Sequence, residues 1–444
     1  MFAIAFFVVA GCAREEKPVV FEPNLVHALK YQIKEDIPTD QALQDANWIT
    51  HRLFGTPDEP TLPEMVIEDE DFASLINMER LKRAAGPDGE GRGLYRKHCA
   101  LCHGVTGNGR GETAAVLRPY PRDYRMGIFK FKSTKRGSKP TREDIAKQIR
   151  NGIPGTAMVK IKELGEQDVQ ALTDYVIYLS IRGELERSLI DDAVFELDLE
   201  GGDRILDTEF ATTMDKETIE FLEDKIEAWE DAGEKEEDQP AELDDFELYQ
   251  ESWEIVEDIV AGLFEDWLDA EDDVVEVPEP AADIPVADSR AEFVELSQGD
   301  QADALAASVK RGQEVFVGKI AACSKCHGEK GLGNGQTTDY DDWTKDWTSR
   351  VGLKPEDYDS LVPLIARGAL PPVNAIPRNF AEGIFHGGST AADLYRRITV
   401  GIEGSPMPAA TFVEGQFEEA DVWHIINFIR SLQNEDAPVA VDAT

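Results

Sequence analysis

The chain is poor in positive charge for its length. Its 444 residues hold 45 Lys and Arg against 88 Asp and Glu, which gives a formal net charge of -43. A polyanion of this size is repelled by the phosphate backbone, so nucleic-acid binding is excluded. Polybasic attachment to anionic lipid is excluded as a general mode for the same reason. Hydrophobic residues still make up 42% of the chain, which is enough apolar material for at least two cores.

The apolar run at the start, residues 1–11, is too short to span a bilayer as a helix, which needs about 20 residues. It suits the apolar core and small-residue end of an export signal, although no Lys or Arg precedes it. Its ending, Val9-Ala10-Gly11-Cys12, resembles a bacterial lipobox. That resemblance implies that Cys12 carries lipid and becomes the mature N-terminus. The alternative is an ordinary cleaved signal with an idle cysteine.

Cysteine is scarce, and four of the five cysteines stand in two copies of one pattern. The copies are Cys99-Ala100-Leu101-Cys102-His103 and Cys323-Ser324-Lys325-Cys326-His327. CxxCH is the c-type haem attachment pattern, in which each thiol adds to a vinyl group and the histidine binds the iron. A lone CxxC could be a redox dithiol or half of a zinc site. Both copies end in His and neither has a second CxxC nearby, so the sequence favours haem.

The two halves repeat each other well beyond the cysteines. Residues 121–129 share a pattern with residues 377–385, and each segment is followed by Ser-Thr. A helical stretch then runs to GIPGTAM in the first half and to GIEGSPM in the second. Asp144 precedes Met158 by 14 positions, and Asp393 precedes Met407 by the same 14. The two domains are therefore duplicates.

Methionine is also scarce, and two of the seven methionines, Met158 and Met407, occupy the same repeat position. A lone Met is more often core filler than a ligand. Two in register behind two CxxCH motifs indicate axial ligands, because haem iron in cytochromes c is commonly held by His and Met. His386 is the one rival ligand for the second haem.

Each repeat resembles a class I cytochrome c, over residues 85–183 and 301–434. The resemblance implies a helix running into CxxCH, a distal methionine loop, and a C-terminal helix that crosses the first with an aromatic contact. Tyr95 with Tyr175, and Phe316 with Phe428, would fill those places. It further implies two covalently bound haem c groups, attached through Cys99, Cys102, Cys323 and Cys326. The implied iron ligands are His103, Met158, His327 and Met407.

Charge separates these domains from the rest of the chain. Residues 85–180 hold 17 basic and 10 acidic side chains, and residues 301–434 hold 13 and 17, whereas residues 181–300 hold 7 and 43. The expected fold is mostly α, with two helical cytochrome c-like domains separated by an acidic, partly helical insert. The expected divisions are a signal (1–12), an extended arm (13–84), the first domain (85–183), the insert (184–300), the second domain (301–434) and a tail (435–444).

Two further expectations concern the insert and the second domain. Residues 216–232 and 251–269 have helical hydrophobic spacing, and we expect flexible linker between and after them. The insert is a solvated spacer, a surface for a basic partner, or a segment that folds back on the basic first domain. Between His327 and Met407 lie 79 residues, against 54 between His103 and Met158, and we expect the surplus to reshape the exposed haem edge.

The predicted function is electron transfer, with no catalytic residue. The chain would carry single electrons between respiratory-chain partners at the outer face of the inner membrane, held there by lipid on Cys12. Its partners would be a redox donor and acceptor, such as a basic cytochrome or a respiratory complex. The alternative is a dihaem peroxidase with one open haem site, and a gas-binding sensor would need an open site as well.

Overall fold

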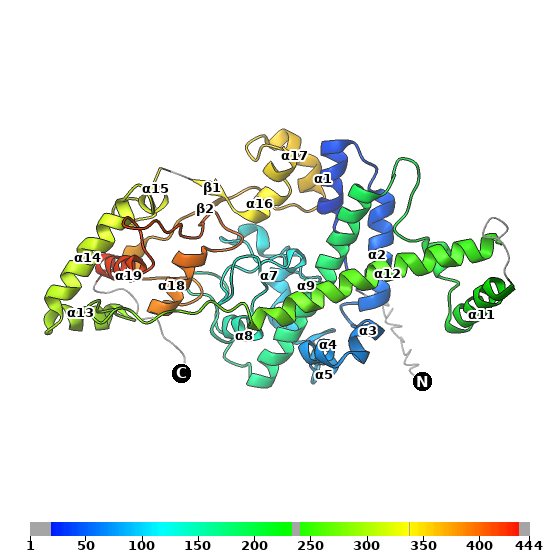
Figure 1. Ribbon diagram of the computed structural model, residues 1–444, viewed down its shortest axis with the longest axis horizontal. Helices are drawn as coiled ribbons and strands as arrows, with labels where there is room; N and C mark the ends of the chain where they lie inside the picture. The colour runs from blue at the N-terminus through cyan, green and yellow to red at the C-terminus, as the bar shows by residue number, and fades with distance from the viewer. Residues whose placement is uncertain (1–18, 233–239, 337, 435–444) are drawn as a thin grey trace, which may run out of the picture.

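The computed structural model describes residues 19–232, 240–336 and 338–434. Within these ranges α-helices dominate, which confirms the mostly α fold (Figure 1). The signal with Cys12 and the tail at 435–444 lie outside the described residues. No helix in the described ranges combines the length and apolar character needed to cross a bilayer.

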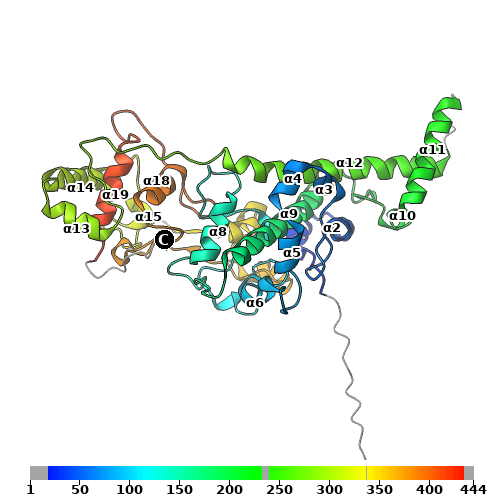
Figure 2. The ribbon, with the colours of Figure 1, turned by 90° about the horizontal axis from the view of Figure 1, so that it is seen from below.

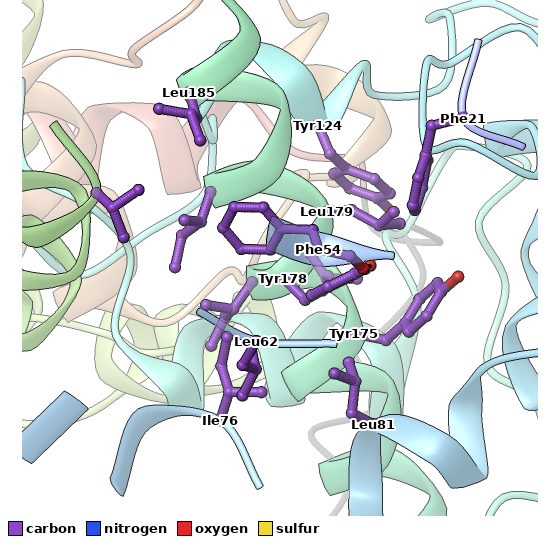
Figure 3. Packing of buried hydrophobic residues seen from close by; sticks show 14 of the residues in the cluster. Phe21, Phe54, Leu62, Ile76, Leu81, Tyr124, Tyr175, Tyr178, Leu179 and Leu185 are labelled. Atoms are coloured by element: carbon purple, nitrogen blue, oxygen red, sulfur yellow. Dashed lines mark hydrogen bonds between the residues drawn. The ribbon is translucent and has the colours of Figure 1, made fainter. Parts of the chain in front are cut away.

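The first haem-type domain is organised around one long helix, α9 (Glu166–Glu196). The CxxCH motif lies at α7 (Ala100–His103), directly after α6 (Leu94–His98). The 3-10 turns η1 (Ala114–Val116) and η2 (Tyr124–Met126) and helix α8 (Arg142–Asn151) follow. Tyr175, Tyr178 and Leu179 on α9 pack against Phe54 and Leu81 from the preceding segment (Figure 3). The expected boundary at residue 183 therefore falls inside α9, which continues to Glu196.

The second domain repeats this plan with helices of different lengths. Its elements are α14 (Ala302–Val317), α15 (Ser324–His327), η6 (Phe380–Glu382), α18 (Ala391–Val400) and α19 (Asp421–Leu432). Helices α14 and α19 cross so closely that a Cβ on Gly312 would lie 1.9 Å from the carbonyl oxygen of His424. Only glycine permits this approach.

Both predicted aromatic contacts at the helix crossings are present. The ring centroids of Tyr95 and Tyr175 are 4.8 Å apart, and those of Phe316 and Phe428 are 5.2 Å apart. The four rings are buried and link the motif helix of each domain to its C-terminal helix. The contact therefore fixes the motif on the domain core in both copies.

The segment before the first domain is not the extended arm that we expected. It forms α1 (Leu25–Glu35), α2 (Asp40–Phe54), α3 (Glu64–Glu68), α4 (Glu70–Leu75) and α5 (Met78–Ala84). Helices α1, α2 and α5 pack against α9. The prolines that suggested an extended chain, Pro38, Pro57, Pro60 and Pro63, stand between helices rather than within them. Proline ends helices without preventing them on either side.

The acidic insert is also more ordered than a linker. It contains α10 (Thr208–Ala211), α11 (Lys216–Ala232), α12 (Ala241–Leu268), η4 (Asp269–Glu271) and α13 (Arg290–Gln298). The expected helix at 216–232 is α11, while α12 starts well before the expected 251. The C-terminal half of α12 buries Val256, Val260, Phe264 and Trp267 in the core of the first domain. Residues 274–275 then pair with Ser133 and Thr134, so this stretch is no free linker.

The other end of the insert projects from the molecule. Helix α11 packs on the N-terminal half of α12 around a small separate core that includes Leu222, Leu243 and Phe246. Figures 1 and 2 both place this hairpin at one end of the molecule, on the opposite side of the first domain from α14 and α19. The insert therefore combines a docked half with a projecting half.

The surplus of the second domain forms β1 (Asp339–Tyr340), α16 (Asp342–Asp346), η5 (Ser349–Val351), α17 (Tyr358–Ala366) and β2 (Asn374–Ala375). Strands β1 and β2 pair antiparallel. Trp347, Leu361 and Leu364 share a small core with Val26 and Leu29 of α1. The surplus therefore ties the second domain to the N-terminal helices.

A buried polar cluster lies beside that core. Asp346 of α16 accepts hydrogen bonds from Arg187 of α9 at 2.9 and 3.2 Å, and Lys30 of α1 lies 3.8 Å from it. The ring of His27 packs there too, with Nε2 2.7 Å from Asp191. Three elements from three parts of the chain are thus held together by charge as well as by apolar packing.

Candidate functional site

The first CxxCH motif forms a tight helical turn that presents its histidine to a cavity. The amides of Cys102 and His103 both donate to the carbonyl of Cys99. The His103 ring stacks on Tyr124, with centroids 4.9 Å apart and an interplanar angle of 12°. Its Nδ1 lies 3.1 Å from the carbonyl oxygen of Arg122. With Nδ1 carrying the proton toward that carbonyl, the lone pair of Nε2 is left for a metal ion.

The second motif repeats this arrangement. His327 stacks on Phe380 at 4.6 Å and 20°, and its Nδ1 lies 3.3 Å from the carbonyl oxygen of Arg378. Burial lowers the pKa of His103 to about 4 and lowers that of His327 as well. Both imidazoles are therefore neutral near pH 7, the form in which histidine binds metal.

The four motif cysteines form no disulfide with one another. Burial raises the pKa of Cys99 to about 12 and that of Cys323 to about 11. A redox dithiol depends instead on a lowered thiol pKa. No group of three or more His, Cys, Asp or Glu that could hold a metal ion occurs among the described residues.

The two distal loops also match. Helix α8 ends at Gly152 and α18 at Gly401, whose φ angles of +71° and +74° favour glycine. The loop then turns back on itself, because the Met158 carbonyl accepts from Ile153 and the Met407 carbonyl accepts from Ile402. A hydroxyl also accepts from each methionine amide: Thr156 at 3.1 Å and Ser405 at 3.3 Å.

One continuous cavity of about 1000 Å³ joins both motifs and both distal loops. Its lining includes all eight residues expected from the sequence: Cys99, Cys102, His103, Met158, Cys323, Cys326, His327 and Met407. Apolar side chains such as Ile149, Val176, Phe385 and Ile429 form much of the remaining wall. A paired thiol, a neutral imidazole, a thioether and an apolar wall in each half fit a covalently attached haem. That the two sites share one cavity could not be predicted from the sequence.

His386 lines the same cavity but has another partner. Its Nε2 accepts from Nη1 of Arg378 at 2.9 Å, and burial with that guanidinium lowers its pKa to about 4. Tyr124, Phe380 and the two arginine carbonyls, which orient the motif histidines, were not identified as site residues. Their signal was the repeated segment at 121–129 and 377–385, whose role only the fold makes clear.

The two domains meet through the distal loops. A Cβ on Gly155 of the first loop would lie 2.7 Å from Cγ2 of Ile384 in the second domain. A Cβ on Gly404 of the second loop would lie 3.2 Å from Cγ2 of Ile128 in the first. Gly155 and Gly404 are repeat equivalents, as are Ile128 and Ile384, so the contact is pseudo-symmetric. Lys132 strengthens it with an ion pair to Glu403.

Comparison with known proteins gives matches over both domains. A family model described as cytochrome c oxidase, cbb3-type, subunit III matches residues 87–176, and one described as cytochrome c matches residues 309–433. No curated protein matches the chain. A solved chain from a reducing HAO-like protein complex of Kuenenia stuttgartiensis is 19% identical, with a TM-score of 0.40. That match covers 81% of this chain and 97% of the other.

The family matches agree with the geometry of each half of the cavity. A cytochrome c domain binds haem through CxxCH, and each matched range contains one such motif. The haem iron supplies one-electron chemistry, while the protein supplies ligands, burial and surface. The two domains belong to the cytochrome c family, and the chain is a dihaem c-type cytochrome with two covalently bound haem c groups that serve electron transfer.

Proposed function

We propose that this cytochrome carries single electrons between respiratory-chain partners at the outer face of the inner membrane. The observation that supports this best is the single cavity, which brings both motifs and both distal loops together. An electron received in one domain then has a short route to the other. Stopped-flow reduction of the intact protein should show both haems reduced in turn by one donor.

The proposed ligands follow the repeat. Cys99 and Cys102 attach one haem, and Cys323 and Cys326 attach the other. His103 with Met158, and His327 with Met407, hold the irons. The thioether raises the reduction potential because it favours ferrous iron. Apolar walls act in the same direction by excluding water.

Near-infrared absorption tests this ligand set. Ferric haem with a bound thioether has a band there, and we expect two such haems per chain. A dihaem peroxidase would instead have one haem with an open or displaceable sixth site. One band per chain, together with peroxide turnover, would contradict the proposed electron carrier and show that the protein is a dihaem peroxidase.

The acidic surface of the projecting hairpin, formed by α11 and the N-terminal half of α12, supports the proposal that the redox partner is basic. Its exposed face carries the carboxylates of Glu217, Glu220, Glu223, Asp224, Glu227, Asp244, Asp245 and Glu247. Complementary charge raises encounter rates and sets orientation, and its effect falls as salt screens it. We expect electron transfer to a basic cytochrome to slow with rising ionic strength.

Neutralising substitutions on that hairpin give the sharpest test. The variant with Glu220, Glu223, Asp224 and Glu227 changed to Gln or Asn should have a smaller salt slope than the wild type. The matched control neutralises four exposed carboxylates outside the hairpin: Glu276, Glu279, Glu295 and Asp300. Equal slopes for all three proteins would leave the hairpin as a solvated spacer.

The anchor at Cys12 is tested by fractionation. A lipid-carrying protein should sediment with membranes, and Cys12→Ser should release it. Bacterial lipoproteins have more than one acyl chain, which stable anchoring generally needs. A wild-type protein recovered without lipid and beginning after residue 12 would indicate an ordinary export signal.

A further inference from the structure

Six Lys and Arg side chains line the cavity: Arg118, Arg122, Lys130, Lys325, Arg378 and Arg397. Four of them lie close to residues of the other domain. Arg122 and Lys130 come from the first domain, and Arg378 and Arg397 come from the second. Lys130 and Arg122 lie within electrostatic reach of each other, and His386 lies within reach of Lys130, Arg378 and Arg397. The four cations therefore form one group rather than two separate ones.

Each half of this group rests on an aromatic ring of the other domain. The guanidinium carbon of Arg122 lies 3.5 Å from the ring centroid of Trp343, and the Lys130 ammonium lies 5.0 Å from it. Arg397 lies 6.0 Å from the ring centroid of Phe131, and the His386 ring meets the edge of Phe131 at 5.8 Å. The two domains therefore position the cations jointly.

None of the four cations forms an ion pair within 4.0 Å among the described residues, although Asp341, Glu382 and Asp393 lie within electrostatic reach of members of the group. Arg378 donates to His386 and Arg397 donates to the carbonyl of Gly388 at 2.7 Å, but neither bond supplies negative charge. Other cations near the domain contact are paired, such as Lys132 with Glu403 and Arg187 with Asp346. Outside the cavity, the buried Arg430 also lacks an ion pair, but it donates to three backbone carbonyls.

Leaving these cations unpaired costs free energy. Burial lowers the pKa of Lys130 to about 8 and the pKa of Arg122 and Arg397 to about 10. Within the described cavity wall the acidic residues are Asp339 and Asp341, on the side of Trp343. Buried charges are normally paired, so the group has the properties of a site that holds anions.

The cavity's own cofactors bring such anions. Each haem carries two propionate carboxylates, so two haems bring four negative charges to a group of four cations. A planar guanidinium binds a carboxylate through two parallel hydrogen bonds, which suits the three arginines. His386 is neutral and can orient Arg378 without adding charge.

We propose that Arg122, Lys130, Arg378 and Arg397 form a shared propionate-binding site that neutralises both haems and couples their reduction potentials. The proposal rests on the haem attachment proposed for each CxxCH motif. If one haem is absent, its propionates no longer neutralise the cations of its domain. Because those cations lie close to the cations of the other domain, their positive charge then acts on the remaining haem. Positive charge near a haem favours ferrous iron and raises its potential.

Redox titration of single-haem proteins tests this coupling. The variant Cys323→Ala with Cys326→Ala retains the first haem and leaves the second pair of cations without propionates. We expect the midpoint potential of the first haem to rise relative to the intact protein. Adding Arg378→Gln and Arg397→Gln to this variant should bring the potential back down. An unchanged potential in the single-haem protein would overturn the shared site.

Charge-neutralising variants of the intact protein provide a second test. Arg122→Gln, or Lys130→Gln if the first variant folds poorly, should lower the midpoint potential of both haems. The matched control is Arg367→Gln, which removes an exposed guanidinium outside the cavity wall and should leave both potentials unchanged. A fall confined to the first haem would show two independent sites and contradict the proposal.

Two readouts separate failure of this proposal from failure of the proposed ligand set. Intact mass counts the attached haems, and the near-infrared band reports methionine binding. Two haems with two such bands, combined with uncoupled potentials, would reject the shared site and leave the ligands in place. A missing haem or band would instead reject the ligand set, and with it the basis of the shared site.

Discussion

The two cytochrome c domains hold the same site on different scaffolds. In the first, α9 has 31 residues and supports the N-terminal helices and α12, whereas its counterpart α19 has 12. The helices that precede the motifs show the reverse, with five residues in α6 and 16 in α14. The stacked histidine and the returning distal loop are nevertheless alike. Haem binding therefore depends on a small set of local contacts, and helices outside that set are free to serve other purposes.

One pair of equivalent buried residues shows how the scaffolds differ. Asp174 on α9 accepts hydrogen bonds from Arg80, Arg142 and the amide of Asn77. Its counterpart Asn427 on α19 donates to the carbonyl of Pro285 and to Ser308. The first domain thus secures its preceding helix with ion pairs, and the second uses neutral hydrogen bonds at the same position.

Removal of the attachment cysteines should have the largest effect. Cys99→Ala with Cys102→Ala should abolish the first haem, because both covalent bonds to the porphyrin are lost. The equivalent change at Cys323 and Cys326 should abolish the second. Intact mass should show one remaining haem in each variant, and two haems in either would contradict the assignment.

Replacement of either distal methionine should leave both haems attached. It should change the ligation and the reduction potential only of the haem whose methionine is replaced. Met158→Ala should lower the potential of the first haem and open its iron to carbon monoxide, because the thioether's preference for ferrous iron is gone. Met407→Ala should do the same for the second. Spectroelectrochemical titration measures both. A Met407→Ala protein that stays six-coordinate at an unchanged potential would point to His386.

Loss of the Asp174 carboxylate should destabilise the first domain. Asp174→Asn removes the buried partner of Arg80 and Arg142, and we expect a cost of about 3 kcal/mol. Chemical denaturation measures it. The controls are Asp168→Asn and Asp421→Asn, which break the equivalent, more exposed pairs with Arg83 and Arg311. Those should cost about 1 kcal/mol each, and an equal loss in all three would show that burial is not the cause.

Acid should weaken the contact of α1 with α9. Burial, together with Arg187, lowers the pKa of His27 to about 4 despite the nearby carboxylate of Asp191. In the unfolded chain the His27 ring has the ordinary pKa of about 6.5, whereas in the folded chain its pKa is about 4. Stability is therefore lost as the pH falls from 6.5 toward 4, by about 2 kcal/mol between pH 7 and 5.

A histidine substitution isolates that contribution. His27→Gln should flatten the pH dependence of the unfolding free energy over this range. His424 of the second domain, whose Nδ1 lies 2.8 Å from the Ser308 hydroxyl, provides the matched position. If His424→Gln flattens the profile as much as His27→Gln, the difference between the domains does not lie in this contact.

The sequence predicted the parts of the site that local spacing determines. The motifs and the register of Met158 and Met407 follow from fixed intervals within one repeat. Both aromatic pairs follow from the resemblance to class I cytochrome c. The shared cavity does not, because it requires contacts such as Trp343 with Arg122 between segments far apart in the chain. The segment between Ser133-Thr134 and Asp144 is longer than the equivalent segment between Ser389-Thr390 and Asp393. Only the fold shows that residues 135–140 make up this extra length and reach the second domain.

The order of the flanking regions was underestimated for a physical reason. Prolines and acidic residues suggested an extended arm and a linker, yet prolines separate the helices and carboxylates lie on their outer faces. The buried stripe of α12 includes Val256, Val260 and Phe264, at helical spacing within a highly charged run. The spacing over 251–269 predicts this stripe, but it does not show that the stripe packs against the first domain.

The pairing of Gly155 with Ile384 and of Gly404 with Ile128 has a consequence for the molecule's assembly. An interface in which each half offers the same patch to the other is isologous, the type formed by two-fold homodimers. The chain is thus arranged as a dimer of its own repeat, with the insert as a covalent connection between the subunits. Such a connection fixes the ratio of the two halves at one to one and makes their association independent of protein concentration.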